Sequence, residues 1–113
     1  MEEVRKDYHS NGKVWTKEFY LDRKLHNENG PAIISYYESG EVEREEYYLN
    51  NQLHREDGPA YISYYRNGEI ELEEYWSYNE KHRMDGPAET RYNEDGSIRV
   101  EINWVYGEES DMA

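Results

Sequence analysis

Three histidines, His26, His54 and His82, are the first residues whose type and regular spacing suggest chemistry, namely metal binding. Zinc is held by nitrogen ligands at about 2.0–2.1 Å, so the ligands of one ion must converge on one point. Equivalent residues of successive hairpin repeats would lie two strands, roughly 10 Å, apart. The three histidines therefore cannot share an ion, and we expect no metal site. Each histidine is instead expected to pack across its hairpin on one aromatic residue: Phe19, Tyr47 or Tyr75.

Four glutamates alternate along two stretches of the chain and could be imagined as the carboxylate pair of a glycosidase. Such a pair needs one acid and one base in contrasting environments. Regular alternation predicts a solvated strand face instead, so we expect no catalytic residue. Tyrosines lie among these glutamates, and tyrosine anchors protein interfaces at low cost in side-chain entropy. The pattern fits either a plain solvated face or a binding surface, whose residues would be Glu43, Glu45, Tyr47, Tyr37, Glu71, Glu73, Tyr75 and Tyr65.

Two Arg-x-Asp-Gly-Pro segments could also hold functional side chains, but we expect a structural role for them. Asp57 and Asp85 can hydrogen-bond their own backbone and so cap the Gly-Pro segments. The equivalent segment at 27–31 has asparagine in place of both charged residues, which a catalytic set would not tolerate. The expected cross-strand ion pairs are Arg55 with Glu46 and Arg83 with Glu74.

The elements that carry all these residues are copies of one motif. Gly-Pro-Ala occurs at 30–32, 58–60 and 86–88, an interval of 28 residues that histidine, glycine and tyrosine also keep. Residues 25–52 and 53–80 are identical at 17 of 28 positions, where roughly two matches would arise by chance. We predict one domain over 1–113, with a partial copy at 1–24, copies at 25–52, 53–80 and 81–108, and a tail at 109–113.

Each copy is predicted to contain two turns and a bulge. Glu-Ser-Gly at 38–40 suits a three-residue hairpin loop that ends on a left-handed glycine, which sets Tyr36 opposite Val42. In the next copy the same loop sets Ile62 opposite Leu72. Asn50-Asn51 suits a two-residue turn that places Tyr48 opposite Leu53. The segment 56–59 then needs one extra residue in a continuing strand, which glycine at positive φ and proline would tolerate.

The expected fold is all-β: an antiparallel meander of hairpin repeats, with about eight strands in one elongated, twisted or curled sheet. In this register the glutamates and tyrosines of the possible binding surface share one face. The other face is expected to be apolar and to carry Ala32, Ile34, Tyr36, Val42, Tyr48, Ala60, Ile62, Tyr64, Ile70, Leu72, Trp76, Ala88, Ile98, Val100, Ile102 and Trp104. A single-layer sheet must cover such a face by curling or by pairing with another chain.

The repeated unit PAxxxYYxxGExExEEYxxNxxLHRxDG resembles the variant class of MORN-like repeats, and in particular the HRxDGPA-bearing repeats of many phage, giant-virus and bacterial proteins. The motif reads LHREDGPA at 53–60, LHNENGPA at 25–32 and KHRMDGPA at 81–88, and the resemblance covers roughly residues 8–108. It implies hairpin repeats in an elongated sheet that makes protein contacts. The likeness to phage proteins also implies, as a possible role, an inhibitor of a host defence enzyme.

The amino-acid composition limits the classes of molecule that the protein could bind. The chain has 26 Asp and Glu against 13 Lys and Arg, a formal charge of −13, so it should repel nucleic acid and anionic lipid and attract basic surfaces. Thirteen tyrosines and three tryptophans argue against disorder. The absence of cysteine excludes a disulfide framework. No apolar signal segment or membrane span is recognisable, so a cytoplasmic location is expected, in the host cell if the protein is phage- or virus-encoded.

We therefore expect a non-enzymatic protein-binding module whose acidic, tyrosine-rich face engages a partner with a basic surface, without a cofactor. Such a partner could be a host defence or nucleic-acid-handling protein whose nucleic-acid groove the acidic face would occlude. Direct contact with nucleic acid or membrane is not expected. Two alternatives stay open: a scaffold that self-associates, for example as a homodimer, and an enzyme of unknown class.

Overall fold

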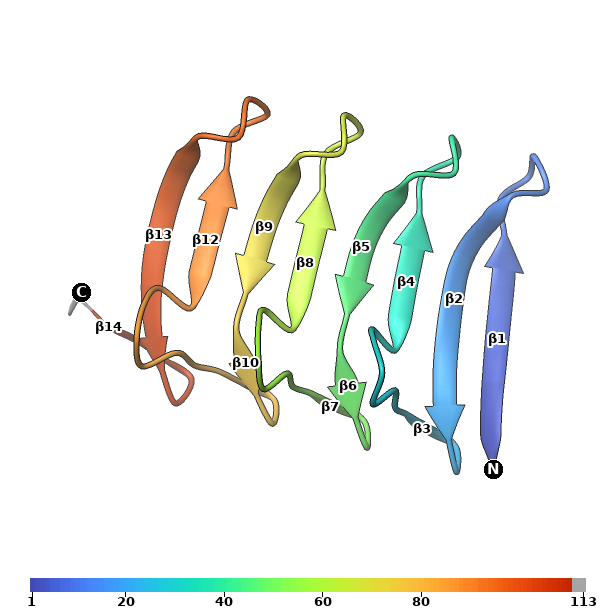
Figure 1. The fold of residues 1–113 in the computed structure, drawn as a ribbon, viewed down its shortest axis with the longest axis horizontal. Coiled ribbons are helices and arrows are strands. Elements are labelled where there is room, and N and C mark those ends of the chain that lie inside the picture. Colours follow the sequence, from blue (N-terminus) through green and yellow to red (C-terminus); the bar gives the residue numbers. More distant parts are fainter. Residues whose placement is uncertain (111–113) are drawn as a thin grey trace.

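Hairpins standing side by side make up the protein, as the computed structural model, which describes residues 1–110, shows (Figure 1). The strands are β1 (Glu2–Tyr8), β2 (Val14–Leu21), β3 (Lys24–Leu25), β4 (Ile33–Tyr36), β5 (Val42–Glu46), β6 (Tyr48–Leu49), β7 (Gln52–Leu53), β8 (Tyr61–Tyr64), β9 (Ile70–Glu74), β10 (Trp76–Ser77), β11 (Glu80–Lys81), β12 (Glu89–Tyr92), β13 (Ile98–Val105) and β14 (Glu108–Ser110).

The long strands form one open antiparallel sheet in the order β1-β2-β4-β5-β8-β9-β12-β13-β14, with no crossover. The molecule is flat, with extents of 45 × 35 × 18 Å. The described residues contain no helix, so none of them forms a helix that could cross a membrane. The predicted all-β meander is confirmed. The division into copies stays a prediction, and the predicted tail falls partly on 111–113, outside the described residues.

The predicted two-residue turns are confirmed. Tyr48 lies opposite Leu53, and Asn50 and Asn51 between them have φ of 49° and 67°. Two successive positive φ values match the right-handed twist of a tight hairpin. The next copy repeats this turn at Tyr78 and Asn79, with φ of 45° and 70°. These turns end the sheet along its lower edge in Figure 1.

The upper hairpins have the predicted loop but not the predicted register. Tyr36 does lie opposite Val42, but Ile62 lies opposite Glu73 and not opposite Leu72, which faces Ser63. The ladder shifts next to the loop, at Ser63/Tyr64 and its equivalents, because the second strand contains one extra residue. Such a bulge moves every later side chain of that strand to the other face. The expectation of one apolar and one acidic face is therefore wrong.

The bulge divides the predicted binding surface between two faces. We call the face of Glu45, Glu73, Tyr47 and Tyr75 the loop face. Its register is fixed by hydrogen bonds from the Tyr64 hydroxyl to Glu45 (2.6 Å) and from the Tyr92 hydroxyl to Glu73 (2.5 Å). The opposite, back face carries the other half of the predicted surface, namely Tyr37, Tyr65, Glu43 and Glu71, and it also carries Leu72.

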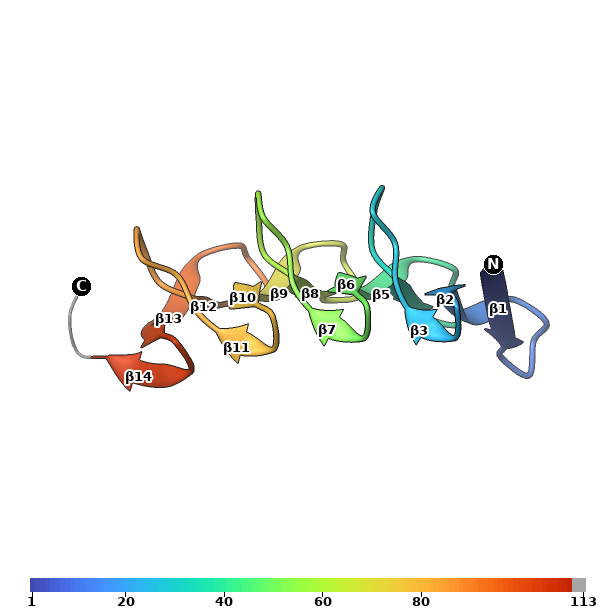
Figure 2. The ribbon, with the colours of Figure 1, turned by 90° about the horizontal axis from the view of Figure 1, so that it is seen from below.

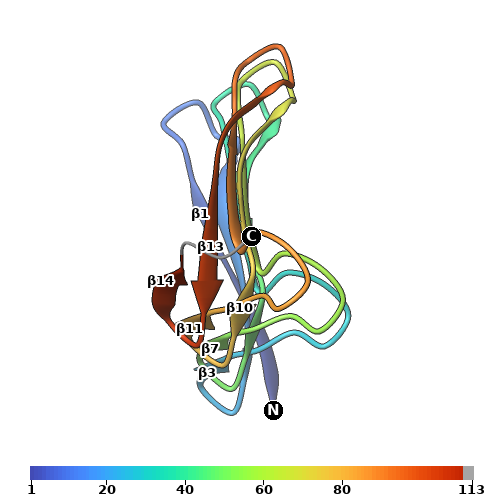
Figure 3. The same cartoon turned by 90° about the vertical axis from the view of Figure 1, so that its left-hand side faces the viewer.

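The prediction that the segments 54–59 and 82–87 continue their strands with a bulge is wrong. After each lower turn the short strand lies on the back-face side, and the following segment crosses beneath the sheet and stands out from the loop face (Figure 3). The chain then returns to the sheet at an alanine. Ala32, Ala60 and Ala88 are fully buried there. Ala60 joins two copies, because its carbonyl accepts from the Tyr47 N–H and its own N–H donates to the Glu74 carbonyl, both at 2.8 Å.

A charged cluster, buried around Glu74, Lys81 and Glu89, lies on the back face where the second and third full copies meet. Lys81 Nζ lies 3.1 Å from Glu74 Oε2 and 2.6 Å from Glu89 Oε1, and Arg91 Nε lies 2.8 Å from Glu89 Oε2. The Lys81 ammonium also lies over the ring of Trp104, 4.6 Å from its centroid. Burial alone would raise the pKa of Glu89, but hydrogen bonds from Lys81 and Arg91 outweigh it and hold this pKa below its usual range.

Candidate binding grooves between the repeat loops

Three segments, 26–31, 54–59 and 82–87, form a row of loops along the loop face (Figure 2). Each is held by the neighbouring lower strand: the Asn27 N–H donates to the Tyr48 carbonyl at 3.2 Å, and the Arg83 N–H donates to the Trp104 carbonyl at 3.0 Å. The loops stand out from the sheet at regular intervals, and the spaces between successive loops are open grooves. The row therefore presents the same geometry several times.

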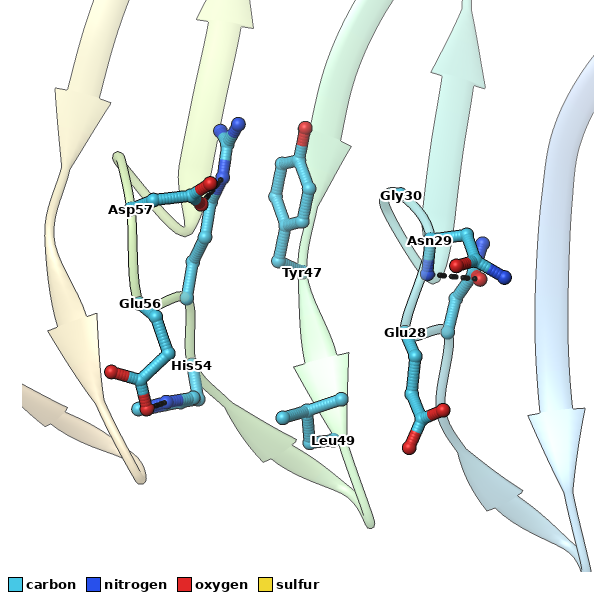
Figure 4. A pocket seen from close by; sticks show the side chains of 10 residues that line it. Glu28, Asn29, Gly30, Tyr47, Leu49, His54, Glu56 and Asp57 are labelled. Atoms are coloured by element: carbon cyan, nitrogen blue, oxygen red, sulfur yellow. Dashed lines mark hydrogen bonds and ion pairs between the residues drawn. The ribbon is translucent and has the colours of Figure 1, made fainter.

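We number the grooves along the chain. The first, of about 400 Å³, lies between β1 and the loop 26–31. The second, of about 450 Å³, lies between the loops 26–31 and 54–59 (Figure 4). The third, of about 420 Å³, lies between the loops 54–59 and 82–87. Leu21 lines the first groove and Leu49, the same position one copy later, lines the second. The third groove has the polar Ser77 at this position.

Exposed carboxylates line the rims of these grooves. In the second groove the side chains of Glu28 and Glu56 are 77% and 80% exposed and reach down on either side of Leu49 (Figure 4). In the first groove Glu2 and Glu28 are the corresponding pair. The third groove has Glu56 on one side but the neutral Met84 at the position that matches it on the other loop. The first two grooves thus combine two carboxylates with a leucine.

The arginines of the loops are already neutralised and stacked. The Arg55 guanidinium lies 4.1 Å from the centroid of the Tyr47 ring, and Arg83 lies at the same distance from Tyr75. Arg55 Nε lies 3.3 Å from Asp57 Oδ1, and its Nη1 donates to the Pro59 carbonyl at 3.1 Å. These cation–π and charge-assisted contacts fix the upper wall of the second and third grooves. Asp57 is held by Arg55, and the second groove keeps Glu28 and Glu56 as two further exposed carboxylates that carry no arginine partner within residues 1–110.

The predicted pairs of Arg55 with Glu46 and of Arg83 with Glu74 are wrong. Glu46 instead pairs with Arg44 at 2.9 Å, and Glu74 pairs with Lys81 at 3.1 Å. The physical reason is that the chain leaves the sheet after the lower hairpin. The arginines therefore lie on the loop face, where a tyrosine ring is closer than the back-face glutamates.

The histidines stabilise the lower turns. His54 Nδ1 accepts the Tyr78 N–H at 3.1 Å, its Nε2 lies 2.9 Å from Glu56 Oε1, and its ring stacks on Tyr78 at 3.8 Å between centroids. His82 repeats the stack on Tyr106 at 4.1 Å. The expected partners Tyr47 and Tyr75 are therefore wrong, whereas the expected packing of His26 on Phe19 stays a prediction. The stack supports the Tyr78 ring at a positive φ, which bulky residues rarely adopt. Among the described residues, no three acidic or histidine side chains gather as metal ligands would.

Of the eight predicted binding residues, only Tyr47 and Tyr75 line the grooves. Glu45 and Glu73 accept tyrosine hydroxyls on the loop face. The Tyr37 and Tyr65 hydroxyls donate to the Tyr64 and Tyr92 carbonyls, at 2.5 and 2.6 Å, and so tie each upper loop to the next copy. The binding role of these eight residues stays a prediction.

Sequence reasoning missed the groove residues Glu28, Leu49, His54 and Glu56. One signal could have found them, because the segment between leucine and Gly-Pro is longer than a tight turn needs and carries carboxylates outside any strand.

The glycines Gly58 and Gly86 leave room for arginine side chains, which is a different reason from the one expected. Gly58 and Gly86 do not have positive φ, but a Cβ at these positions would lie 3.0 and 2.9 Å from the guanidinium carbon of Arg55 and Arg83. At Gly30 the nearest atom is Asn27 Nδ2 at 3.8 Å, an ordinary contact.

We expect Gly58→Ala and Gly86→Ala each to lower the free energy of unfolding by about 1–2 kcal/mol, because the added methyl group displaces a packed guanidinium. Gly30→Ala is the matched control and should be neutral to within about 0.5 kcal/mol; equal losses at all three positions in urea denaturation would refute this explanation.

Comparison with known protein families agrees with the hairpin architecture. Residues 4–22 and 33–50, which span β1–β2 and β4–β6, match the family model described as the MORN repeat variant. MORN repeats are non-catalytic modules that often take part in binding, and the resemblance to the MORN variant class is confirmed at these two repeats. No curated protein and no solved structure matches the chain.

Proposed function

We propose that this chain, which carries repeats of the MORN variant class, is a non-catalytic protein-binding module that takes a basic, extended segment of its partner across the first and second grooves. The observation that carries the proposal is the pair of exposed carboxylates flanking a leucine, present twice in succession. Glu28 belongs to both grooves, and Glu56 completes the second.

This chemistry suits a lysine or arginine side chain. Its aliphatic stem can lie on Leu49 while its charged head stays between Glu28 and Glu56, in the way that long basic side chains cover apolar surface. A single exposed ion pair contributes only about 0–1 kcal/mol, so several grooves must act together. The formal charge of −13 adds long-range attraction and faster association with a basic partner.

The spacing of the grooves selects the conformation of the bound segment. Equivalent positions in successive copies are two strands apart, or roughly 10 Å in a β-sheet. A polyproline II segment rises about 3.1 Å per residue with three residues per turn, so residues three apart point the same way at about 9.3 Å. The segment should therefore carry basic residues three positions apart. A partner with such a basic surface could be one that handles nucleic acid, in which case binding would block that surface.

The test uses two synthetic peptides that are neutral apart from two arginines, placed three positions apart in one and two positions apart in the other. We expect the first to bind more tightly in fluorescence anisotropy, and its affinity to fall as salt is added because exposed charges are screened. Glu28→Lys should weaken binding most, by roughly tenfold or more, since it removes a carboxylate from two grooves.

Two variants separate groove binding from general charge. Glu38→Lys makes the same charge change on an exposed residue of an upper loop and should leave the affinity within about twofold of the parent. Leu49→Ser gives the second groove the residue found in the third and should weaken binding without any change in charge. Equal losses for Glu28→Lys and Glu38→Lys would mean that only the net charge matters, and the groove proposal would then be wrong.

A further inference from the structure

The two ends of the sheet are complementary strands. Every junction between copies inside the molecule is the same short antiparallel ladder of three residue pairs, as in β2 with β4, β5 with β8 and β9 with β12. In each junction the second strand of one hairpin meets the first strand of the next. At the two ends of the sheet formed by residues 1–110, β13 is a second strand that meets only the short strand β14, and β1 is a first strand that pairs with β2 alone.

The repeat predicts how these two strands would meet. In the last internal junction Leu72, Glu73 and Glu74 lie opposite Arg91, Thr90 and Glu89. Moving Leu72, Glu73 and Glu74 forward by one 28-residue period, and Arg91, Thr90 and Glu89 back by three, places Val100, Glu101 and Ile102 of β13 opposite Asp7, Lys6 and Arg5 of β1. We propose that β1 of one molecule adds to β13 of a second copy of this chain in this register, so that the repeat continues from one molecule into the next.

The main-chain groups needed for this ladder point outward. The Met1 carbonyl accepts the Asp22 N–H across β1 and β2. Bonding alternates along an antiparallel pair, so Lys6 falls at a position whose N–H and C=O face away from β2. Directly after β9 the Tyr75 N–H donates to the Ala88 carbonyl, so the N–H of Glu73, two residues earlier, also faces β12. Glu101 is the equivalent of Glu73, and its main-chain groups therefore face the open edge of β13.

One side-chain hydrogen bond, from a tyrosine to a glutamate, repeats inside the molecule. A further donor for it lies at one end of the sheet and a further acceptor at the other end. The Tyr64 hydroxyl donates to Glu45, and the Tyr92 hydroxyl donates to Glu73, in both cases a glutamate 19 residues earlier. At the first junction Lys17 occupies this place, 19 residues before Tyr36. Glu101 is the next glutamate of this row, and no tyrosine of the described chain reaches it in this way. Tyr8 is the first tyrosine of the row and is 57% exposed. The proposed register brings the Tyr8 hydroxyl of one molecule to the Glu101 carboxylate of the other.

The central residues of the proposed ladder, Lys6 of β1 and Glu101 of β13, carry opposite charges. Residues 1–24 contain six Lys and Arg against five Asp and Glu, whereas residues 25–113 contain seven against 21. Lys6 lies directly opposite Lys17 across β1 and β2, and facing like charges destabilise a sheet. The carboxylate of Glu101 would lie beside this lysine pair and offset the repulsion. A lysine on an edge strand discourages non-specific strand pairing, and here it would select an edge that carries glutamate.

Within residues 1–110, the arrangement of the two ends leaves room for the contact. Viewed along the sheet, the N-terminal end of β1 and the short strand β14 lie on different sides of the lower hairpins (Figure 3). The lower half of β13 pairs with β14 from Asn103 onward, so it leaves Val100, Glu101 and Ile102 available. This is the three-residue length that the internal junctions use. The contact joins two different surfaces and does not close, so it generates chains of molecules and not only dimers.

The test is sedimentation velocity of the full chain over a series of concentrations. We expect the average sedimentation coefficient to rise beyond that of a dimer. Lys6→Glu and Glu101→Lys should each weaken association by roughly three- to tenfold, because an attractive cross-strand pair becomes a repulsive one. Mixing these two variants should restore association, because every contact then pairs a lysine with a glutamate. Tyr8→Phe should weaken association by about tenfold through the lost hydrogen bond.

The controls keep the outcome decisive. Lys6→Glu faces Lys17 in its own hairpin, so the variant should stay folded. Lys24→Glu makes the same charge change on an exposed residue away from both edges and should leave association unchanged. A parent protein that stays monomeric at the highest soluble concentration would overturn the proposal. So would association that survives both single variants or that their mixture does not restore. The contact uses neither Leu49 nor Glu56, so its failure leaves the groove proposal intact.

Discussion

Replacing Lys81 with leucine should lower the free energy of unfolding by about 3 kcal/mol, the largest loss that we expect from a single substitution. The ammonium group neutralises Glu74 and Glu89, whose side chains are only 13% and 4% exposed. Without Lys81 two carboxylates stay close together in a poorly hydrated site, and only Arg91 and the Trp76 indole still donate to them. Urea denaturation followed by circular dichroism measures the effect.

The preceding copy supplies a matched rescue for this variant. At the positions equivalent to Lys81 and Glu89 it has Leu53 and Tyr61, and no cation of this kind. Adding Glu89→Tyr to Lys81→Leu should therefore recover part of the lost stability, because one of the two stranded carboxylates is removed. Lys24→Leu, a change at an exposed lysine, should cost no more than about 0.5 kcal/mol. A loss below about 1 kcal/mol for Lys81→Leu would show that the cluster adds little to stability.

Alkaline pH should unfold the protein through its tyrosines, and this is the second large effect that we expect. Burial, and then the hydrogen bond to Glu45, raises the pKa of Tyr64, and burial with the bond to Glu46 does the same for Tyr48. The hydrogen bond to Glu73, with burial, raises the pKa of Tyr92 to about 12 from a usual value of 10.0. Each of these hydroxyls thus keeps its proton longer in the folded chain than in the unfolded chain.

The sign of the pH dependence follows from that difference. A group with a raised pKa in the folded state contributes its full stabilisation below its unfolded pKa and loses it as the pH rises through the folded value. Stability should therefore fall above a pH of about 10, as the unfolded chain begins to release protons that the folded chain retains. Circular dichroism and the absorbance of phenolate, recorded together, should show ionisation of these tyrosines only as the sheet is lost.

A variant sharpens this prediction. Tyr92→Phe removes one raised group and should make the loss of stability with rising pH less steep than in the parent. If all the tyrosines ionise near their usual pKa while the sheet stays intact, the tyrosine–glutamate hydrogen bonds contribute nothing to stability.

Turn chemistry and the repeat predicted the meander, because both are local properties of the sequence. Asn50-Asn51 predicted its tight turn, and Gly40, with φ of 100°, ends the upper loop as expected. The predicted register is wrong at Glu45, because one inserted residue moves the following side chains to the opposite face of the sheet. Hydrophobic alternation does not reveal such an insertion when both faces carry polar and apolar residues. The shifted register brings Glu45 within hydrogen-bonding distance of the Tyr64 hydroxyl, which donates to it.

The candidate site was less predictable than the fold. Placing Arg55 near Glu46 assumed that the strand stays in the sheet after the lower turn. The path of the loop depends on contacts between copies, such as the stack of His54 on Tyr78 and the cover of Tyr47 by Arg55. These are tertiary contacts, and a spacing of residues along one chain does not specify them. The grooves exist only because such loops stand side by side.

Nuclear magnetic resonance of the isotope-labelled protein, titrated with the peptide whose arginines are three positions apart, tests the groove proposal most directly. Binding in the first two grooves predicts that backbone signals move most at Glu28, Leu49 and Glu56 and that Glu28→Lys abolishes the shifts. Shifts confined to the back face around Tyr37 and Glu71, or no shifts at saturating peptide, would contradict the proposal that the loops form the binding site.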